Sequence, residues 1–239
     1  MSDDGNPKIY LLPNLMTAGN LFCGFAATLK ILEGALLQAA ATPATLEAVE
    51  AAAADKFHFA ILCILASCVF DALDGRLARL GGSESPFGRE FDSLADIVSF
   101  GMAPAMLVSK AVLFPLPANV GWILAFVYLL CGAMRLARFN CLALIPKKAH
   151  STSDFRGIPI PMAAGFIASL TFLIIDIYRT DRELGFWKYA LAAAMLGLSA
   201  LMISDVRYPS FKRVDLRTKS TLWAIVVAAV LIVVTVKFR

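Results

Sequence analysis

Four aspartates fall within 26 residues of this sequence, at spacings that suit chemistry on a phosphate group. Asp71 and Asp74 are three residues apart, and Asp92 and Asp96 are four apart, so each pair shares one face of a helix. A short stretch rich in glycine and proline separates the two pairs. We therefore expect the four carboxylates to converge between two antiparallel helices.

Carboxylates at such close range cannot all stay ionised without cations, and burial near lipid makes their repulsion worse. Carboxylate oxygens suit Mg²⁺ or Mn²⁺ rather than Zn²⁺, and two such ions ~3.5–4 Å apart could clamp a diphosphate. Gly75 leaves room for a ligand beside Asp74, and Arg79 offers a fork of donors for phosphate oxygens. The spacing alone leaves two other interpretations open: a proton or cation pathway, and helices paired through Arg76 and Arg79.

The composition indicates which kind of protein carries these residues. Of 239 residues, 59% are apolar or aromatic and 17% are charged, against about 25% charged in an ordinary soluble domain. The mean hydropathy is +0.73. These values exclude a soluble domain, a disordered chain, collagen and a coiled coil. They predict an all-α polytopic membrane helix bundle that forms a single domain over residues 1–239, and the net charge of +4 does not suggest a nucleic-acid partner.

Seven apolar stretches predict about seven transmembrane helices, because a helix needs ~20 mostly apolar residues to cross the hydrocarbon. They cover residues 9–29, 57–70, 97–109, 114–134, 158–175, 189–204 and 221–236. The segment 33–56 is rich in alanine but contains Pro43 and carries Glu47, Glu50 and Asp55. It is expected to be an external helix that does not span the membrane.

The distribution of Lys and Arg predicts how the chain is oriented. Fourteen of the 22 cationic residues fall in the segments 1–8, 76–89, 135–156 and 207–219. By the positive-inside rule these segments face the cytoplasm. We therefore expect a multi-pass protein of the cell inner membrane, with the lipid bilayer as its partner and the aspartates at the cytoplasmic side.

The aspartates belong to a longer pattern, Asp71-x2-Asp74-Gly75-x2-Ala78-Arg79-x8-Gly88-x3-Asp92-x3-Asp96. This stretch, residues 71–96, resembles the complete catalytic motif of the CDP-alcohol phosphotransferases, with no departure at any fixed position. The resemblance implies a six-helix membrane core, a homodimer, and two divalent cations, Mg or Mn, at a site facing the cytoplasm. It also implies that an alcohol attacks the β-phosphorus of a CDP-linked donor and releases CMP.

Four other stretches, residues 12–24, 135–140, 155–161 and 207–212, resemble the membrane phosphatidylserine synthases of bacterial type. This closer resemblance implies transfer of the phosphatidyl group from CDP-diacylglycerol to L-serine. No cysteine or serine–histidine arrangement offers an activated nucleophile, so a direct displacement is expected. The same chemistry with glycerol 3-phosphate or inositol, and a cation transporter, remain the alternatives.

The resemblance also implies roles for individual residues. Asp71 and Asp92 would bridge both metals, Asp74 and Asp96 would each complete one ion's shell, and Asp96 would be the catalytic general base. The positions that would contact the CDP-lipid are Asn14, Thr17, Gly75, Ala78, Arg79, Ser85 and Gly88.

Two pairs of residues are also assigned from their chemistry. Asn14 and Thr17 share a helix face, and their alternative role is hydrogen bonding to another helix. Arg138 and Asn140 lie at the predicted cytoplasmic end of the fourth span, where they could bind serine. Arg138 could hold the serine carboxylate through two hydrogen bonds, or it could instead be an anchor that reaches to the lipid headgroups.

Overall fold

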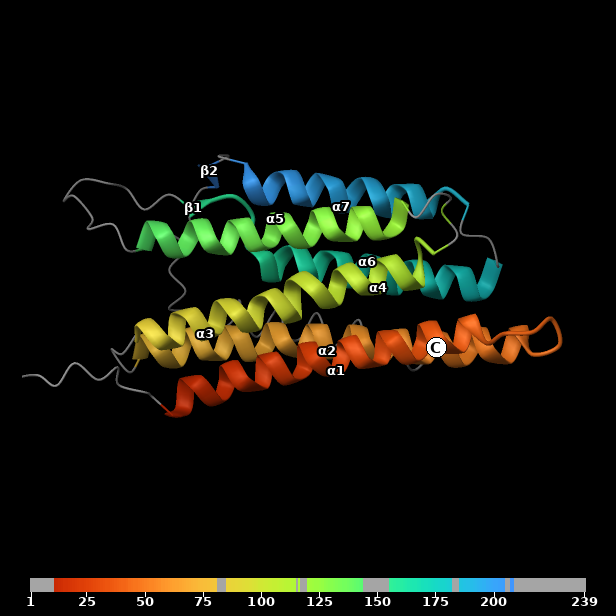
Figure 1. The fold of residues 1–239 in the computed structure, drawn as a ribbon, viewed down its shortest axis with the longest axis horizontal. Coiled ribbons are helices and arrows are strands. Elements are labelled where there is room, and N and C mark those ends of the chain that lie inside the picture. The colour runs from red at the N-terminus through yellow and green to blue at the C-terminus, as the bar shows by residue number, and fades with distance from the viewer. Residues whose placement is uncertain are drawn as a thin grey trace, which may run out of the picture.

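The computed structural model describes residues 11–80, 85–114, 116, 120–143, 155–181, 185–204 and 207–208. Seven α-helices run through these residues: α1 (Leu11–Ala39), α2 (Leu46–Leu80), α3 (Pro86–Asp96), α4 (Ala103–Ala111), α5 (Val120–Ala143), α6 (Ile160–Asp181) and α7 (Trp187–Ile203). A π-helical turn, Ile97–Met102, joins α3 to α4. The helices lie side by side along the long axis of the molecule (Figure 1).

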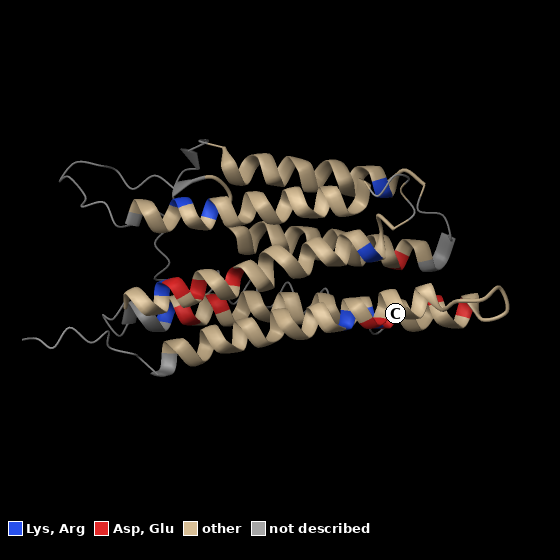
Figure 2. Ribbon diagram, viewed as in Figure 1, with Lys and Arg blue, Asp and Glu red and all other residues tan. Residues whose placement is uncertain are grey.

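The predicted membrane helix bundle is confirmed. Within the described residues, five helical segments are long and apolar enough to cross a membrane: Pro13–Ala39, Leu46–Arg76, Pro86–Ala111, Val120–Leu142 and Ile160–Tyr178. Helix α7 is apolar but shorter. Charged residues gather toward the two ends of the bundle and leave an uncharged zone between them (Figure 2). This arrangement suits a protein that crosses a bilayer several times.

Two predicted segments, residues 221–236 and 33–56, do not appear in the structure as separate helices among the described residues. The seventh predicted span, residues 221–236, lies outside the described residues. The segment 33–56 is not a separate helix, because its first residues continue α1 and its last residues begin α2. Glu33 is accommodated within α1 because Lys30 and Lys56 each place their Nζ 2.8 Å from its carboxylate. That the segment 33–56 lies outside the bilayer stays a prediction.

Helices α1 and α2 are long compared with the thickness of a bilayer. Helix α1 has 29 residues and α2 has 35, so they extend about 43 Å and about 52 Å. The hydrocarbon layer is only ~30 Å thick. The hairpin of α1 and α2 is therefore longer than an upright span requires.

Close packing of α1 against its neighbours depends on small residues. Ala27, Ala53 and Ala60 are fully buried, and small side chains let membrane helices approach closely. Gly19 lies against the ring of Phe70, where a Cβ would be 3.0 Å from ring carbons. The packing of α1 on α2 thus fixes the helix that carries Asp71 and Asp74 relative to the start of the chain.

The π-helical turn follows directly after Asp96. Two buried hydroxyl groups bond to backbone carbonyls at this level: Tyr128 donates to the Phe100 oxygen at 3.2 Å, and Ser99 donates to the Asn20 oxygen at 2.9 Å. A π-helical turn interrupts the regular hydrogen-bond ladder, so side-chain donors that satisfy nearby carbonyls stabilise it. The turn is thereby held between α1 and α5.

Two short strands connect the segments that flank α6 and α7. β1 (Phe155–Arg156) pairs antiparallel with β2 (Arg207–Tyr208). Gly157 follows with a φ of 77°, and a Cβ there would lie 2.7 Å from the Met202 carbonyl oxygen. The backbone before α6 is therefore tied to the end of α7 through a position that requires glycine.

Gly24 provides a test of how α1 meets the π-helical turn. A Cβ at Gly24 would lie 2.6 Å from the Ser99 Cα, so Gly24→Ala must displace backbone. We expect a loss of about 1–3 kcal/mol of stability, measured as a lower apparent melting temperature of the purified protein in detergent. Gly197→Ala in α7 is the control, because nothing lies within 4 Å of its Cβ position. Equal melting temperatures for the two variants would contradict this packing.

Candidate functional site

The structure brings three of the four aspartates together. One carboxylate oxygen from each of Asp71, Asp92 and Asp96 lies within 4.8 Å of the other two. Asp71 comes from α2 and the other two from α3, as the spacing predicted. Figure 2 shows acidic residues of α2 and α3 gathered near one end of the bundle.

Asp74 lies beside this trio and is held from α1. The Thr17 hydroxyl donates to Asp74 Oδ2 at 2.6 Å. The other oxygen, Oδ1, is buried and has no hydrogen-bond partner among the described residues, and the same holds for Asp92 Oδ1. Burying a carboxylate oxygen without a hydrogen-bond partner costs free energy unless a cation binds to that oxygen. An all-oxygen donor set of this kind fits a hard divalent cation.

Asn20 is a site residue that the sequence analysis missed. It is fully buried, and its Nδ2 donates to Asp96 Oδ1 at 3.1 Å. Asn14, Thr17 and Asn20 recur every three residues, so they share one face of α1. Extending the Asn14–Thr17 spacing by one step would have found this residue.

The start of α3 lies against the start of α1. Ser85 caps α3 by accepting a hydrogen bond from the Gly88 amide at 2.9 Å, and Pro86 occupies the first turn. A Cβ at Gly88 would lie 3.1 Å from Ser85 Oγ and 3.5 Å from Asn14 Oδ1. Three residues predicted to contact the CDP-lipid therefore meet here, and Asn14 Nδ2 is buried without a partner in the described structure.

The remaining predicted lipid contacts lie at the end of α2. Gly75 directly follows Asp74 and is exposed. Ala78 and Arg79 lie in the last turns of α2, but their side chains are outside the described part of the structure. Their positions in the chain place them at the same end of the bundle as the four aspartates.

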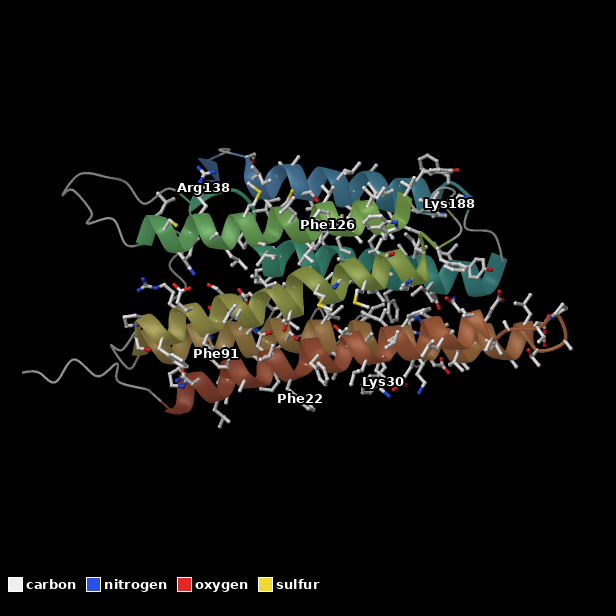
Figure 3. The ribbon with its side chains drawn as sticks, viewed as in Figure 1. Phe22, Lys30, Phe91, Phe126, Arg138 and Lys188 are labelled. Carbon is white, nitrogen blue, oxygen red and sulfur yellow. The ribbon has the colours of Figure 1, made fainter. Side chains whose placement is uncertain are left out.

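The two residues predicted to bind serine point to different neighbours. Arg138 Nη1 donates to the Ile203 carbonyl oxygen at the end of α7, at 3.4 Å, and Figure 3 shows Arg138 on that side of α5. Asn140 Nδ2 instead donates to Ser93 Oγ of α3 at 3.0 Å and to Glu90 at 3.3 Å. In the structure the two side chains therefore contact different helices, α7 and α3.

Arg135 is a second residue that the sequence analysis passed over. It lies one turn before Arg138 on α5, is half-buried, and interacts electrostatically with the Asp96 carboxylate. Its Nε is buried and makes no hydrogen bond to the described residues. The sequence could have indicated Arg135, because acidic residues inside a membrane bundle pair with cationic side chains that face the bundle interior.

The apolar helices and the carboxylate cluster at one end of the bundle define an integral membrane protein with a candidate divalent-cation site. The sequence matches the family described as CDP-alcohol phosphatidyltransferase over residues 10–236. This chain belongs to the CDP-alcohol phosphatidyltransferase family, as the aspartate pattern predicted.

Three relatives illustrate the similarity. The CDP-diacylglycerol–serine O-phosphatidyltransferase of Helicobacter pylori (strain J99) is 34% identical over 220 residues, which cover 90% of this chain and 78% of the relative. The protein of the same name from Bacillus subtilis is 32% identical, covering 84% and 92%. The archaetidylserine synthase of Methanothermobacter thermautotrophicus is 31% identical, covering 90% and 75%.

Proposed function

We propose that this enzyme transfers the phosphatidyl group of CDP-diacylglycerol to L-serine and releases CMP. The observation that carries the proposal is the carboxylate cluster of Asp71, Asp92 and Asp96, in a chain similar over most of its length to relatives named for transfer to serine. Neither another alcohol acceptor nor cation transport is favoured by these relatives.

Two divalent cations, Mg²⁺ or Mn²⁺, are proposed at the aspartates. Asp71 and Asp92 would be shared by both ions, while Asp74 and Asp96 would each complete one shell. The partnerless oxygens of Asp74 and Asp92 support this assignment. When bound, such cations supply positive charge that polarises the phosphate and stabilises the CMP leaving group.

Asp96 is proposed as the general base. Its carboxylate takes the proton of the serine hydroxyl while the hydroxyl oxygen forms a bond to the β-phosphorus, and the bond from that phosphorus to the CMP oxygen breaks. The Asn20 amide donates to Asp96 Oδ1, so this carboxylate is held from α1 beside Asp71 and Asp92. The displacement is direct and forms no covalent bond to the protein.

The CDP-lipid is proposed to lie over the ends of three helices that meet beside the aspartates. Its contacts would be Asn14, Thr17, Gly75, Ala78, Arg79, Ser85 and Gly88. The partnerless Asn14 Nδ2, next to Gly88, is a donor that can reach a ligand oxygen. Thr17 differs from the others because its hydroxyl already donates to Asp74.

We also propose that Arg135, rather than Arg138, binds the serine carboxylate. Arg135 interacts with Asp96 and keeps a buried Nε without a partner, whereas Arg138 donates to the end of α7. A guanidinium can hold a carboxylate through two parallel hydrogen bonds. Asn140 remains a contact between α5 and α3.

Arg135 and Arg138 form a matched pair for testing this assignment. Arg135→Gln is expected to raise the KM for L-serine at least about tenfold, because one lost charged hydrogen-bonding group costs about 1.5–3 kcal/mol. The KM for CDP-diacylglycerol should change little, and Arg138→Gln should leave the serine KM near that of the wild type. A larger effect at Arg138 than at Arg135 would reverse the assignment.

The proposed reaction is tested by CMP release from purified enzyme with CDP-diacylglycerol, with and without L-serine. Release that depends on serine, together with phosphatidylserine formation, is the expected result. Product formed only with glycerol 3-phosphate or inositol would overturn the choice of acceptor. Ion flux in proteoliposomes without any CMP release would overturn the reaction itself.

We also propose where the enzyme lies in the cell and how its chains assemble. We place the enzyme in the cell inner membrane with the aspartates facing the cytoplasm, where soluble serine is available. The arginines of α5 near the aspartate end of the bundle support this orientation (Figure 2). A homodimer, which the family resemblance implies, is retained as a proposal.

A further inference from the structure

One face of α1 donates hydrogen bonds to two different aspartates. Thr17 and Asn20 are one turn apart, and their side chains are 1% and 0% exposed. The Thr17 hydroxyl donates to Asp74 Oδ2 at 2.6 Å, and Asn20 Nδ2 donates to Asp96 Oδ1 at 3.1 Å. Thus α1, which contributes no carboxylate to the cluster, contacts one aspartate on α2 and one on α3.

Each donor engages only one oxygen of its carboxylate. Asp74 Oδ1 is left buried without a partner in the described structure, and Asp96 still provides an oxygen to the trio with Asp71 and Asp92. An aspartate side chain can turn about its bonds, so fixing one oxygen determines where the other oxygen points. Hydrogen-bond donors behind metal-binding carboxylates orient them in this manner.

Asn20 is itself held by two neighbouring elements. The Asn20 backbone oxygen accepts hydrogen bonds from Ser67 Oγ of α2 at 3.3 Å and from Ser99 Oγ of the π-helical turn at 2.9 Å. Both serine side chains are fully buried. One turn further along α1, Gly24 allows the Ser99 backbone to approach closely. Asn20 therefore joins three elements through its backbone and reaches Asp96 through its side chain.

We infer that Thr17 and Asn20 are positioning residues that preset the aspartates for a divalent cation. Each holds one carboxylate oxygen so that the second oxygen faces the cluster before any cation arrives. This inference rests on the proposed metal site. It makes α1 a determinant of cation affinity, in addition to its predicted contacts with the CDP-lipid.

The test measures Mn²⁺ binding to the purified full-length protein by electron paramagnetic resonance, without substrate. Thr17→Val and Asn20→Leu keep the side-chain size and remove the donors. Each is expected to weaken Mn²⁺ binding about 10- to 100-fold. Thr17→Ser keeps the hydroxyl and should bind Mn²⁺ nearly as the wild type does. Thr28→Val is the control on the same helix, because among the described residues the Thr28 hydroxyl donates to the Gly24 carbonyl oxygen within α1 and not to an aspartate.

The outcomes separate this inference from the proposed function. If the wild type binds Mn²⁺ and Thr17→Val binds it equally well, the positioning role is wrong while the metal site stands. An equal loss in Thr28→Val would also overturn the positioning role, because the effect would not be specific to the aspartate contacts. If the wild type binds no Mn²⁺, the proposed metal site itself fails. Should Asn20→Leu not fold, the comparison of Thr17→Val with Thr17→Ser decides.

Discussion

Replacing Asp96 with asparagine is expected to lower turnover by about 10²- to 10⁴-fold, which is the usual contribution of a general base. Asparagine keeps the size of the side chain and one oxygen that can bind a cation, but it cannot take the serine proton. Its single oxygen can either accept the Asn20 hydrogen bond seen at Asp96 Oδ1 or face the cluster. Affinity for CDP-diacylglycerol should fall much less, because Asp71, Asp74 and Asp92 remain.

Asp71→Asn is the informative comparison. Asp71 is one of the three clustered carboxylates and is proposed to contact both ions, so its charge supports the whole metal site. We expect this variant to lose metal-dependent binding of CDP-diacylglycerol as well as turnover. Both quantities should be measured for both variants. Near-normal turnover of Asp96→Asn would show that Asp96 is not the base.

Removal of divalent cations should have the second large effect. Excess EDTA is expected to abolish CMP release, and added Mg²⁺ or Mn²⁺ should restore it, because the cluster consists of carboxylate oxygens. Without cations these charges would repel one another and the diphosphate of the donor. The measurement is the rate of CMP release against free metal concentration. Full turnover in excess EDTA would contradict the metal site.

Local spacing explains why much of this site could be predicted from the sequence. Asp71 with Asp74, and Asp92 with Asp96, are neighbours on their own helices, and a short connection forces the two helices together. The apolar spans follow from composition in the same direct way. These features depend on residues close together in the chain, so the sequence contains the information needed to find them.

The contacts missed from the sequence join residues far apart in the chain. Asn20 is 76 residues from Asp96, and only the packing of α1 against α3 reveals their hydrogen bond. The different directions of Arg135 and Arg138 likewise depend on which helix packs on each side of α5. The π-helical turn after Asp96 alters the helical period there, and no spacing in the sequence indicated it.

The pairing of β1 with β2 has a consequence for how this chain is assembled. The paired residues Phe155 and Tyr208 flank both α6 and α7, so the pairing encloses these two helices in a closed loop of backbone. During synthesis the loop cannot close until α7 has been inserted and its end has returned to the side where α6 began. A chain stopped before β2 has all four aspartates but leaves this loop open. Closure of the loop is thus a late event in biogenesis, after the helices that bear the aspartates are complete.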